Sequence, residues 1–135
     1  MDMNVLMSAL IKDSLTRRLI SKSQNQLWFP EAAYKLLLGF RKAITKRTGS
    51  EVKDVDALIK GLFTHIRIFP GNEMGENSAK ARRAMAGIDL EDAIFVACAL
   101  SLPDSAVWSN DKHLKMQKLV MVYTTEELVK EYGSR

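Results

Sequence analysis

Acidic residues gather in the stretch 89–113, where residue types and spacing point to cation chemistry. Asp89 and Asp92 precede an apolar run (93–100), and Asp111 follows a short apolar segment. Three positions along a helix bring Asp89 and Asp92 to the same face. In an open α/β sheet, ligands bind beyond the carboxyl ends of the strands, which is where Asp111 is expected. Acids far apart in the sequence are therefore expected to meet around one divalent cation.

Local structure explains the same acids without a cation. Asp89 is a favourable helix N-cap, and the negative charge of Asp92 in the first turn suits the helix dipole. Asp111, just before Lys112 and His113, is equally suited to capping the next helix. Both explanations stay open on this stretch alone, and the choice depends on an acid elsewhere in the chain.

Composition and charge describe an ordinary globular chain. The 135 residues are 47% hydrophobic and 27% charged, which favours a single domain over residues 1–135. The net charge of +4 permits an anionic partner such as RNA without demanding one. Cys98 is the one cysteine and lies in the apolar run, so we expect a buried thiol in a reducing compartment.

Membrane segments and targeting signals are not expected. No apolar run approaches the ~18 residues of a membrane span, and charged residues interrupt any candidate signal peptide near the start. The sequence therefore predicts a cytoplasmic protein with no membrane partner.

Hydrophobic periodicity predicts helices that alternate with short strands. Helices are expected over 8–23, 30–46, 51–63, 72–86, about 89–100, and from 124 or 125 onward; strands are expected over 27–29, 65–69, 106–108 and 119–123. Such alternation favours a layered α/β fold around a mainly parallel sheet.

Asp2 raises a question about the first strand. If Asp2 closes a central strand, almost no residues precede it in that strand. Two alternatives stay open: a truncated first strand, or a strand that begins after Asp2.

A set of short motifs is spread over essentially the whole chain. The motifs are DMNVL (2–6) with SALI (8–11), WFPE (28–31), GIDLEDA (87–93) with the Ala-rich run, WSNDKH (108–113) and VYTTEEL (122–128). Together they resemble the PIN domain family, in its prokaryotic, toxin-like subgroup. The resemblance implies a three-layer α/β/α sandwich with a mainly parallel central sheet.

The same resemblance implies a function. PIN domains gather acids that bind Mg²⁺ or Mn²⁺ for phosphodiester cleavage, usually of RNA. Many are toxins of toxin–antitoxin pairs, and many form dimers, so RNA, an antitoxin protein and a homodimer are the expected partners. Mg²⁺ prefers oxygen ligands, and a metal-bound water becomes the attacking hydroxide. Carried over by position, the catalytic and metal-binding residues are Asp2, Asp92 and Asp111, and the supporting residues are Asn4, Asp89 and Ser109.

One family acid is missing. The family places a glutamate near the position of Leu36, where this chain has no acid, and Glu31 lies five positions earlier on a different helix face. Two functions therefore compete: a metal-dependent ribonuclease, or a catalytically impaired PIN-like module that binds RNA or protein. Leu36 itself is expected either to face the site or to lie in the core.

Basic side chains are expected around the acidic pocket, because a polyanion approaches acids only through a surrounding positive field. The candidates are Arg17, Arg18, Arg41 and Lys42, or Lys112 and Lys115.

Overall fold

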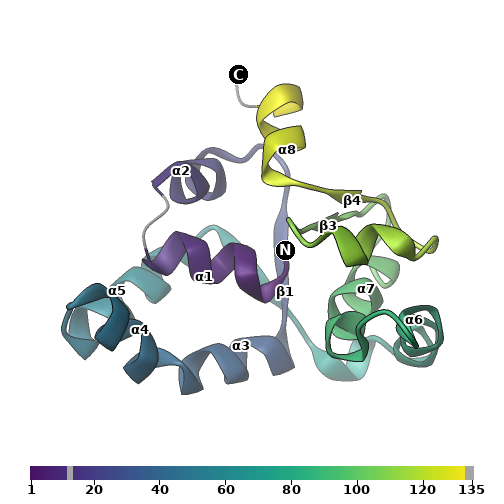
Figure 1. Cartoon of the computed structure of the whole chain (residues 1–135), viewed down its shortest axis with the longest axis horizontal. Coiled ribbons are helices and arrows are strands. Elements are labelled where there is room, and N and C mark those ends of the chain that lie inside the picture. Colours follow the sequence, from purple (N-terminus) through teal and green to yellow (C-terminus); the bar gives the residue numbers. More distant parts are fainter. Residues whose placement is uncertain (12–13, 133–135) are drawn as a thin grey trace.

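The structure, a computed structural model, describes residues 1–11 and 14–132 (Figure 1). Its elements are, in order, α1 (Met3–Ile11), α2 (Ser14–Lys22), β1 (Leu27–Pro30), α3 (Glu31–Gly39), α4 (Arg41–Thr48), α5 (Val52–Leu62), β2 (Ile66–Phe69), the 3₁₀ helix η1 (Gly71–Glu73), α6 (Asn77–Met85), η2 (Leu90–Asp92), α7 (Ala93–Leu100), β3 (Val107–Trp108), η3 (Lys112–Met116), β4 (Val122–Tyr123) and α8 (Thr125–Tyr132).

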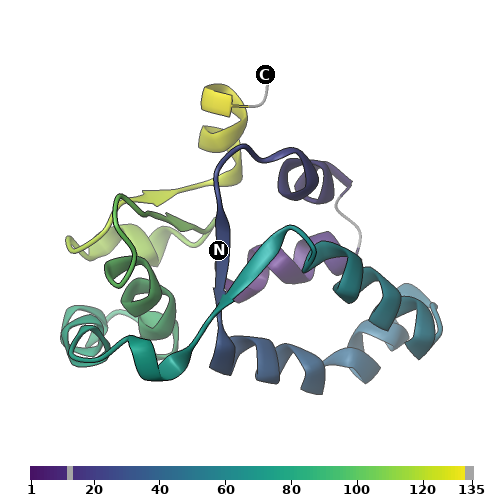
Figure 2. The same ribbon diagram turned by 180° about the vertical axis from the view of Figure 1, so that it is seen from behind.

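The strands form two parallel pairs. β1 pairs with β2, from Leu27 opposite Ile66 to Pro30 opposite Phe69. β3 pairs with β4, with Val107 opposite Val122. Helices flank the strands on both sides in the front and rear views (Figures 1 and 2). The expected α/β/α class with parallel strands is therefore confirmed.

The first two residues lie between these strand pairs. The amino group of Met1 donates to the carbonyl oxygen of Trp28 in β1 at 3.2 Å, and the backbone N–H of Asp2 donates to that of Trp108 in β3 at 2.9 Å. The chain then enters α1 directly, because Asp2 Oδ1 accepts from the backbone N–H of Val5 at 3.0 Å, as an N-cap does. A strand beginning after Asp2, one of the two alternatives, is therefore wrong.

The core is centred on Phe29 of β1, which is fully buried. Its ring centroid lies 5.9 Å from those of Phe63 and Phe95. α7 contributes Phe95 and a series of small residues, and it packs closely against α6. Cys98 lies in this helix and is buried, as expected, and burial raises the pKa of its thiol to about 11.

Some predicted boundaries were wrong. The helix expected over 30–46 is two helices, broken at Phe40 (φ −90°, ψ 2°). The apolar periodicity continues across the break, so the sequence pattern did not reveal it. The first helix starts at Met3 rather than at residue 8, and residues 12–13 of the expected helix lie outside the described residues. The last strand covers only Val122–Tyr123, and α6 begins at Asn77.

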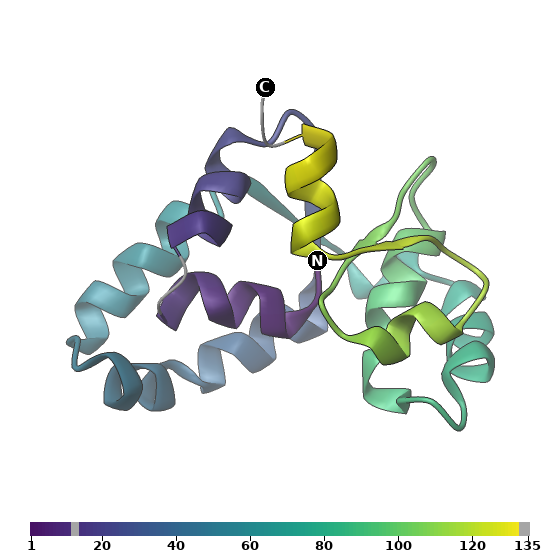
Figure 3. The same cartoon turned by 45° about the horizontal axis from the view of Figure 1, so that its top comes forward.

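α8 closes the fold near the first residues of the chain. Figure 3 shows α8 beside the N-terminus and directly after β4. Among the helices of the described residues, none combines the length and apolar character that crossing a bilayer requires.

Candidate metal centre

Three carboxylates converge where the segment before α7 meets the loop after β3. Asp89, Asp92 and Asp111 each place one carboxylate oxygen within 4.8 Å of the other two, and all three side chains are half-buried. Asp89 directly precedes η2, Asp92 is its last residue, and Asp111 comes three residues after β3 ends. The structure thus brings together two acids that the sequence assigned to the metal, Asp92 and Asp111, with Asp89, which it assigned a supporting role.

Helix capping explains part of this arrangement. Asp89 Oδ1 accepts from the backbone N–H of Glu91 at 3.1 Å, and Asp111 Oδ1 accepts from that of His113 at 2.9 Å. Each carboxylate has a second oxygen, so capping leaves both acids able to bind a cation. Asp92 precedes α7 but makes no side-chain capping hydrogen bond there. Capping therefore does not explain Asp92.

The pKa of Asp92 shows that no positive charge of the described residues offsets the repulsion among these acids. Burial first, and then the nearby carboxylates of Asp89, Asp2 and Asp111, raise the pKa of Asp92 to about 6. Like charges this close disfavour ionisation, and a bound cation would remove that penalty. The donor set is made of carboxylate oxygens, which suits Mg²⁺ or Mn²⁺. The residues present therefore fit a hard divalent cation.

Asp2 lies beside this trio but is not one of its members. Its side chain is only 3% exposed. One oxygen accepts from the backbone of Val5, and the other accepts from the Ser109 hydroxyl. Its charge nevertheless contributes to the raised pKa of Asp92. Direct binding of the cation by Asp2 stays a prediction.

Ser109 connects Asp2 to the loop that carries Asp111. Its fully buried hydroxyl donates to the Asp2 carboxylate and accepts from the backbone N–H of Asp111 at 3.0 Å. Asn4, the other expected helper, is exposed in the first turn of α1.

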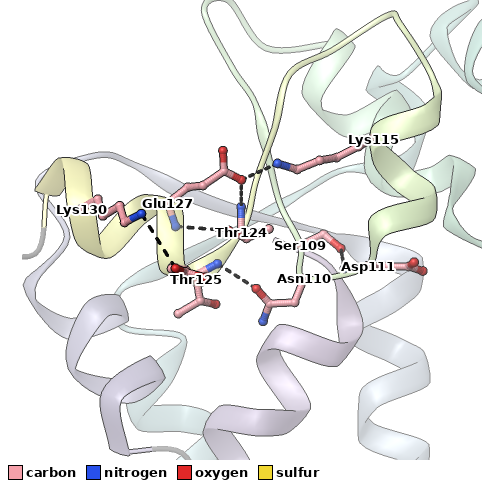
Figure 4. Close-up of polar contacts among 9 residues, drawn as sticks. Ser109, Asn110, Asp111, Lys115, Thr124, Thr125, Glu127 and Lys130 are labelled. Carbon is pink, nitrogen blue, oxygen red and sulfur yellow. Dashed lines mark hydrogen bonds and ion pairs between the residues drawn. The ribbon is translucent and has the colours of Figure 1, made fainter.

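A second polar network positions the same loop (Figure 4). The sequence predicted that Thr124 or Thr125 caps the last helix, but not the contacts of Asn110 and Lys115 with this cap. Asn110 Oδ1 accepts from the backbone N–H of Thr125 at 2.8 Å. Thr124 and Glu127 form a reciprocal capping box at the start of α8, at 3.0 and 3.2 Å. Lys115 of η3 pairs with Glu127. The T-x-x-E spacing at 124–127 was the signal that predicts this box.

Leu36 lies on the surface of α3, with 60% of its area exposed. The alternative that places it in the core is therefore wrong. Glu31, at the start of the same helix, accepts from the backbone N–H of Gly71 at 3.1 Å and so links α3 to η1.

Several of the cations expected around the site have other partners. Arg41 pairs with Asp56 at 3.1 Å, Arg17 donates to the carbonyl oxygen of Ala9, and Lys115 pairs with Glu127. Lys112 directly follows Asp111 and is exposed. Of the expected cations, Lys112 is the one that is adjacent in sequence to a clustered acid.

Comparison with known proteins identifies the family. A family model described as PIN domain matches residues 1–132. No curated protein and no solved structure matches the chain significantly. PIN domains are generally nucleases and typically use divalent metals. With a family match over nearly its whole length, and with its acids gathered beside parallel strands, this chain belongs to the PIN domain family.

Proposed function

We propose that this protein is a metal-dependent ribonuclease that hydrolyses RNA phosphodiesters with Mg²⁺ or Mn²⁺. The observation that carries the proposal is the convergence of Asp89, Asp92 and Asp111, whose oxygens lie within 4.8 Å of one another. Asp92 strengthens it, because its pKa is raised to about 6 by burial and by its acidic neighbours, and it makes no capping hydrogen bond. Because ionising Asp92 beside other carboxylates is unfavourable, a bound cation would stabilise its ionised form strongly.

The residues have separable roles. Asp89, Asp92 and Asp111 hold the cation, and Asp2 adds negative charge from the buried side. When bound, a divalent cation neutralises phosphate charge and lowers the pKa of a water molecule. Ser109 fixes the backbone of Asp111 relative to Asp2, so the acids from both ends of the chain keep one geometry.

RNA is the proposed substrate because the protein as a whole carries a net positive charge, although the site itself is acidic. The net charge is +4, and exposed Lys112 lies next to Asp111. Such a field attracts a polyanion, and its effect weakens with salt. We expect cleavage of single-stranded RNA to slow as the salt concentration rises, and a rate independent of salt would contradict an electrostatic approach.

The test combines Mn²⁺ titration with an RNA cleavage assay. We expect Asp92→Asn to abolish cleavage and weaken Mn²⁺ binding, and Asp89→Asn and Asp111→Asn to weaken both. Asp104→Asn is the matched control, since Asp104 is an exposed acid at a positive φ of 51°, which asparagine tolerates. Cleavage by Asp92→Asn at the unsubstituted rate would overturn the proposal.

Asp2→Asn separates direct binding of the metal from positioning. If Asp2 binds the cation, Asp2→Asn weakens Mn²⁺ binding as much as Asp92→Asn does. If Asp2 acts through Val5 and Ser109, the main effect of Asp2→Asn is a lower melting temperature. Its Mn²⁺ affinity then falls less than that of Asp92→Asn. We expect the second result, because both Asp2 oxygens already accept hydrogen bonds.

The catalytically impaired module is the competing function, and one observation favours it. Leu36 and Phe40 are exposed, at 60% and 39%, and leave apolar surface around the end of α3. Such surface is typical of a contact with another protein. This alternative gains support if the chain binds RNA without cleaving it at saturating Mn²⁺.

The biological setting is proposed from the motif resemblance alone. We propose that the protein is the toxin of a toxin–antitoxin pair, neutralised by an antitoxin protein, and that it forms a homodimer. Growth arrest on induction, reversed by Asp92→Asn, tests the toxin role. Light scattering of the purified chain tests the dimer.

A further inference from the structure

Neighbouring residues of the segment after β3 contact two different parts of the fold. The Ser109 hydroxyl donates to the Asp2 carboxylate, and Asp111 is one of the three clustered acids. Between them, Asn110 accepts through Oδ1 from the backbone N–H of Thr125 at 2.8 Å. Figure 4 shows the Asn110 side chain directed toward the start of α8 and the Asp111 carboxylate directed away from it. Successive side chains of an extended segment point to opposite sides, so this segment contacts α8 on one side and the acids on the other.

The first residue of α8, Thr125, is held through two of its polar groups. Its N–H donates to Asn110, and its hydroxyl oxygen accepts from the indole N–H of Trp108 at 2.9 Å. Trp108 is a buried residue of β3 and lies opposite Tyr123 of β4. The start of α8 is therefore fixed relative to the strands, and Asn110 is bonded to it. Because the first N–H groups of a helix have no partner inside the helix, simple capping of α8 is the competing explanation for the Asn110 bond.

Hydrogen bonds of two kinds hold Asp111. Its N–H donates to the Ser109 hydroxyl at 3.0 Å, and its Oδ1 accepts from the N–H of His113 at 2.9 Å. Both bonds lie within the segment 109–113, so they move with the segment and do not fix it relative to the other acids. Bonds that leave the segment do so, and the bond from Asn110 to α8 is one of them, made by the residue directly before Asp111.

We propose that Asn110 is a positioning residue of the metal centre, which holds Asp111 in place relative to the other two acids by binding its loop to the start of α8. This inference rests on the proposed metal site and adds α8 to the scaffold that determines its affinity. Contacts that orient metal ligands typically account for about 10–100-fold in metal affinity. Because Asn110 is exposed and is not itself a member of the acid cluster, we expect its removal to cost about tenfold, at the low end of this range.

The cation and α8 are then coupled in both directions. If breaking the bond between Asn110 and Thr125 weakens metal binding by a given factor, metal binding favours that bond by the same factor. Saturating Mn²⁺ should therefore slow the hydrogen exchange of backbone amides in α8, although α8 supplies none of the three clustered acids. Simple capping predicts no such response, because a bond that serves only the helix does not depend on whether the acids hold a cation.

The first experiment is a calorimetric titration of Mn²⁺ into the full 135-residue chain and into Asn110→Ala, each well below its melting temperature. We expect Asn110→Ala to bind Mn²⁺ about tenfold more weakly than the unsubstituted chain. Asn72→Ala is the matched control, because Asn72 is an exposed asparagine in η1, and its Mn²⁺ affinity should not change. A lower melting temperature of Asn110→Ala with unchanged Mn²⁺ affinity would show simple capping and overturn the proposal.

Two substitutions of Thr125 remove the other side of the bond without changing any charge. Proline is favoured at the first position of a helix, so Thr125→Pro keeps α8 while it removes both the N–H and the hydroxyl. Thr125→Ala removes the hydroxyl alone, so the difference between the two variants isolates the N–H that binds Asn110. We expect Thr125→Pro to bind Mn²⁺ about tenfold more weakly than Thr125→Ala, and Asn110→Ala added to Thr125→Pro to cost nothing further, because both remove one bond. Equal affinities of Thr125→Pro and Thr125→Ala would contradict the proposal.

Hydrogen exchange and Asp92→Asn complete the test. Mn²⁺ should slow exchange in α8 of the unsubstituted chain and have a smaller effect in Asn110→Ala; equal slowing in both would contradict coupling through Asn110. Asp92→Asn separates this inference from the proposed function. If Asp92→Asn weakens Mn²⁺ binding and Asn110→Ala does not, the metal centre stands and the positioning role is wrong. If neither substitution changes Mn²⁺ binding, both proposals are wrong.

Discussion

Ser109 donates its hydroxyl hydrogen bond to the carboxylate of Asp2, which lies 107 residues earlier in the chain. Both side chains are buried, at 0% and 3% exposure. The same hydroxyl accepts from the backbone of Asp111, one of the three clustered acids. The Ser109 side chain therefore connects the start of the chain, through hydrogen bonds, to the loop of the candidate metal centre.

Removing this hydroxyl should cost stability. Ser109→Ala leaves a buried carboxylate oxygen and the Asp111 amide without their partner, and we expect a loss of about 1–3 kcal/mol in the free energy of unfolding. Urea denaturation measures it. Ser105→Ala is the control, because the Ser105 hydroxyl makes only an exposed local hydrogen bond to Pro103. Equal stability of the two variants would show that the Asp2–Ser109 bond contributes nothing.

Asp92 should make the metal-free protein less stable as pH rises. Its folded pKa, about 6, lies above the ordinary 3.8, so the folded state holds this proton more tightly than the unfolded state. The contribution is fully present below about pH 4 and is lost as pH rises toward 6. In chelator, Asp92→Asn should therefore melt at a higher temperature than the unsubstituted chain at pH 7, and the difference should disappear near pH 4. An unchanged difference across this range would contradict the raised pKa.

Protonation of the Asp92 carboxylate should compete with metal binding. Carboxylate ligands must be ionised, and with a pKa of about 6 most Asp92 side chains are protonated at pH 5 and ionised at pH 7. Isothermal titration with Mn²⁺ should show affinity about tenfold lower at pH 5 than at pH 7. Asp104→Asn should keep this pH dependence, and Asp92→Asn should lose most of it.

The sequence predicted the meeting of Asp92 and Asp111 because both acids adjoin ends of regular elements in a parallel α/β fold. The family resemblance assigned Asp89 a supporting role, and capping also accounts for its type and position. The structure shows that Asp89 caps η2 and joins the cluster at the same time. Local capping patterns do not reveal whether the second oxygen of a carboxylate faces other acids.

Other features depended on tertiary contacts that periodicity does not record. The break at Phe40 lies inside a continuous apolar pattern, so no composition signal separates α3 from α4. Asp2 caps α1, yet the position of Met1 and Asp2 between β1 and β3 follows from two other bonds. The Met1 amino group donates to Trp28 and the Asp2 backbone N–H donates to Trp108, and neither bond has a sequence pattern.

Glu127 should stabilise the fold down to unusually low pH. Its hydrogen bond with Lys115, and those with Thr124, lower its pKa from 4.5 to about 2. A lowered pKa contributes stability that is present above pH 4.5 and lost as pH falls toward 2. Glu127→Gln should therefore melt at a lower temperature than the unsubstituted chain at pH 6, with the gap closing near pH 2. Glu126→Gln, at an exposed neighbouring position whose ion pair with Lys130 is long at 3.9 Å, should show a much smaller gap.

Leu36→Glu tests whether this chain lacks a metal ligand or uses this surface for another purpose. Because Leu36 is 60% exposed, the new carboxylate stays in water, and we expect the free energy of unfolding to change by no more than about 0.5 kcal/mol. If position 36 faces the acids, the variant should bind Mn²⁺ more tightly and cleave single-stranded RNA faster, since a fourth carboxylate adds both a ligand and charge.

Val52→Glu is the matched control for that experiment. Val52 is 43% exposed and begins α5, so it receives the same charge on a different helix. We expect the melting temperature of Leu36→Glu, but not that of Val52→Glu, to rise further on adding Mn²⁺, because the cation stabilises the folded state in proportion to its affinity. Equal Mn²⁺ responses in both variants would show that the family glutamate does not map to Leu36. The exposed apolar surface around Leu36 and Phe40 would then be better explained as a protein contact.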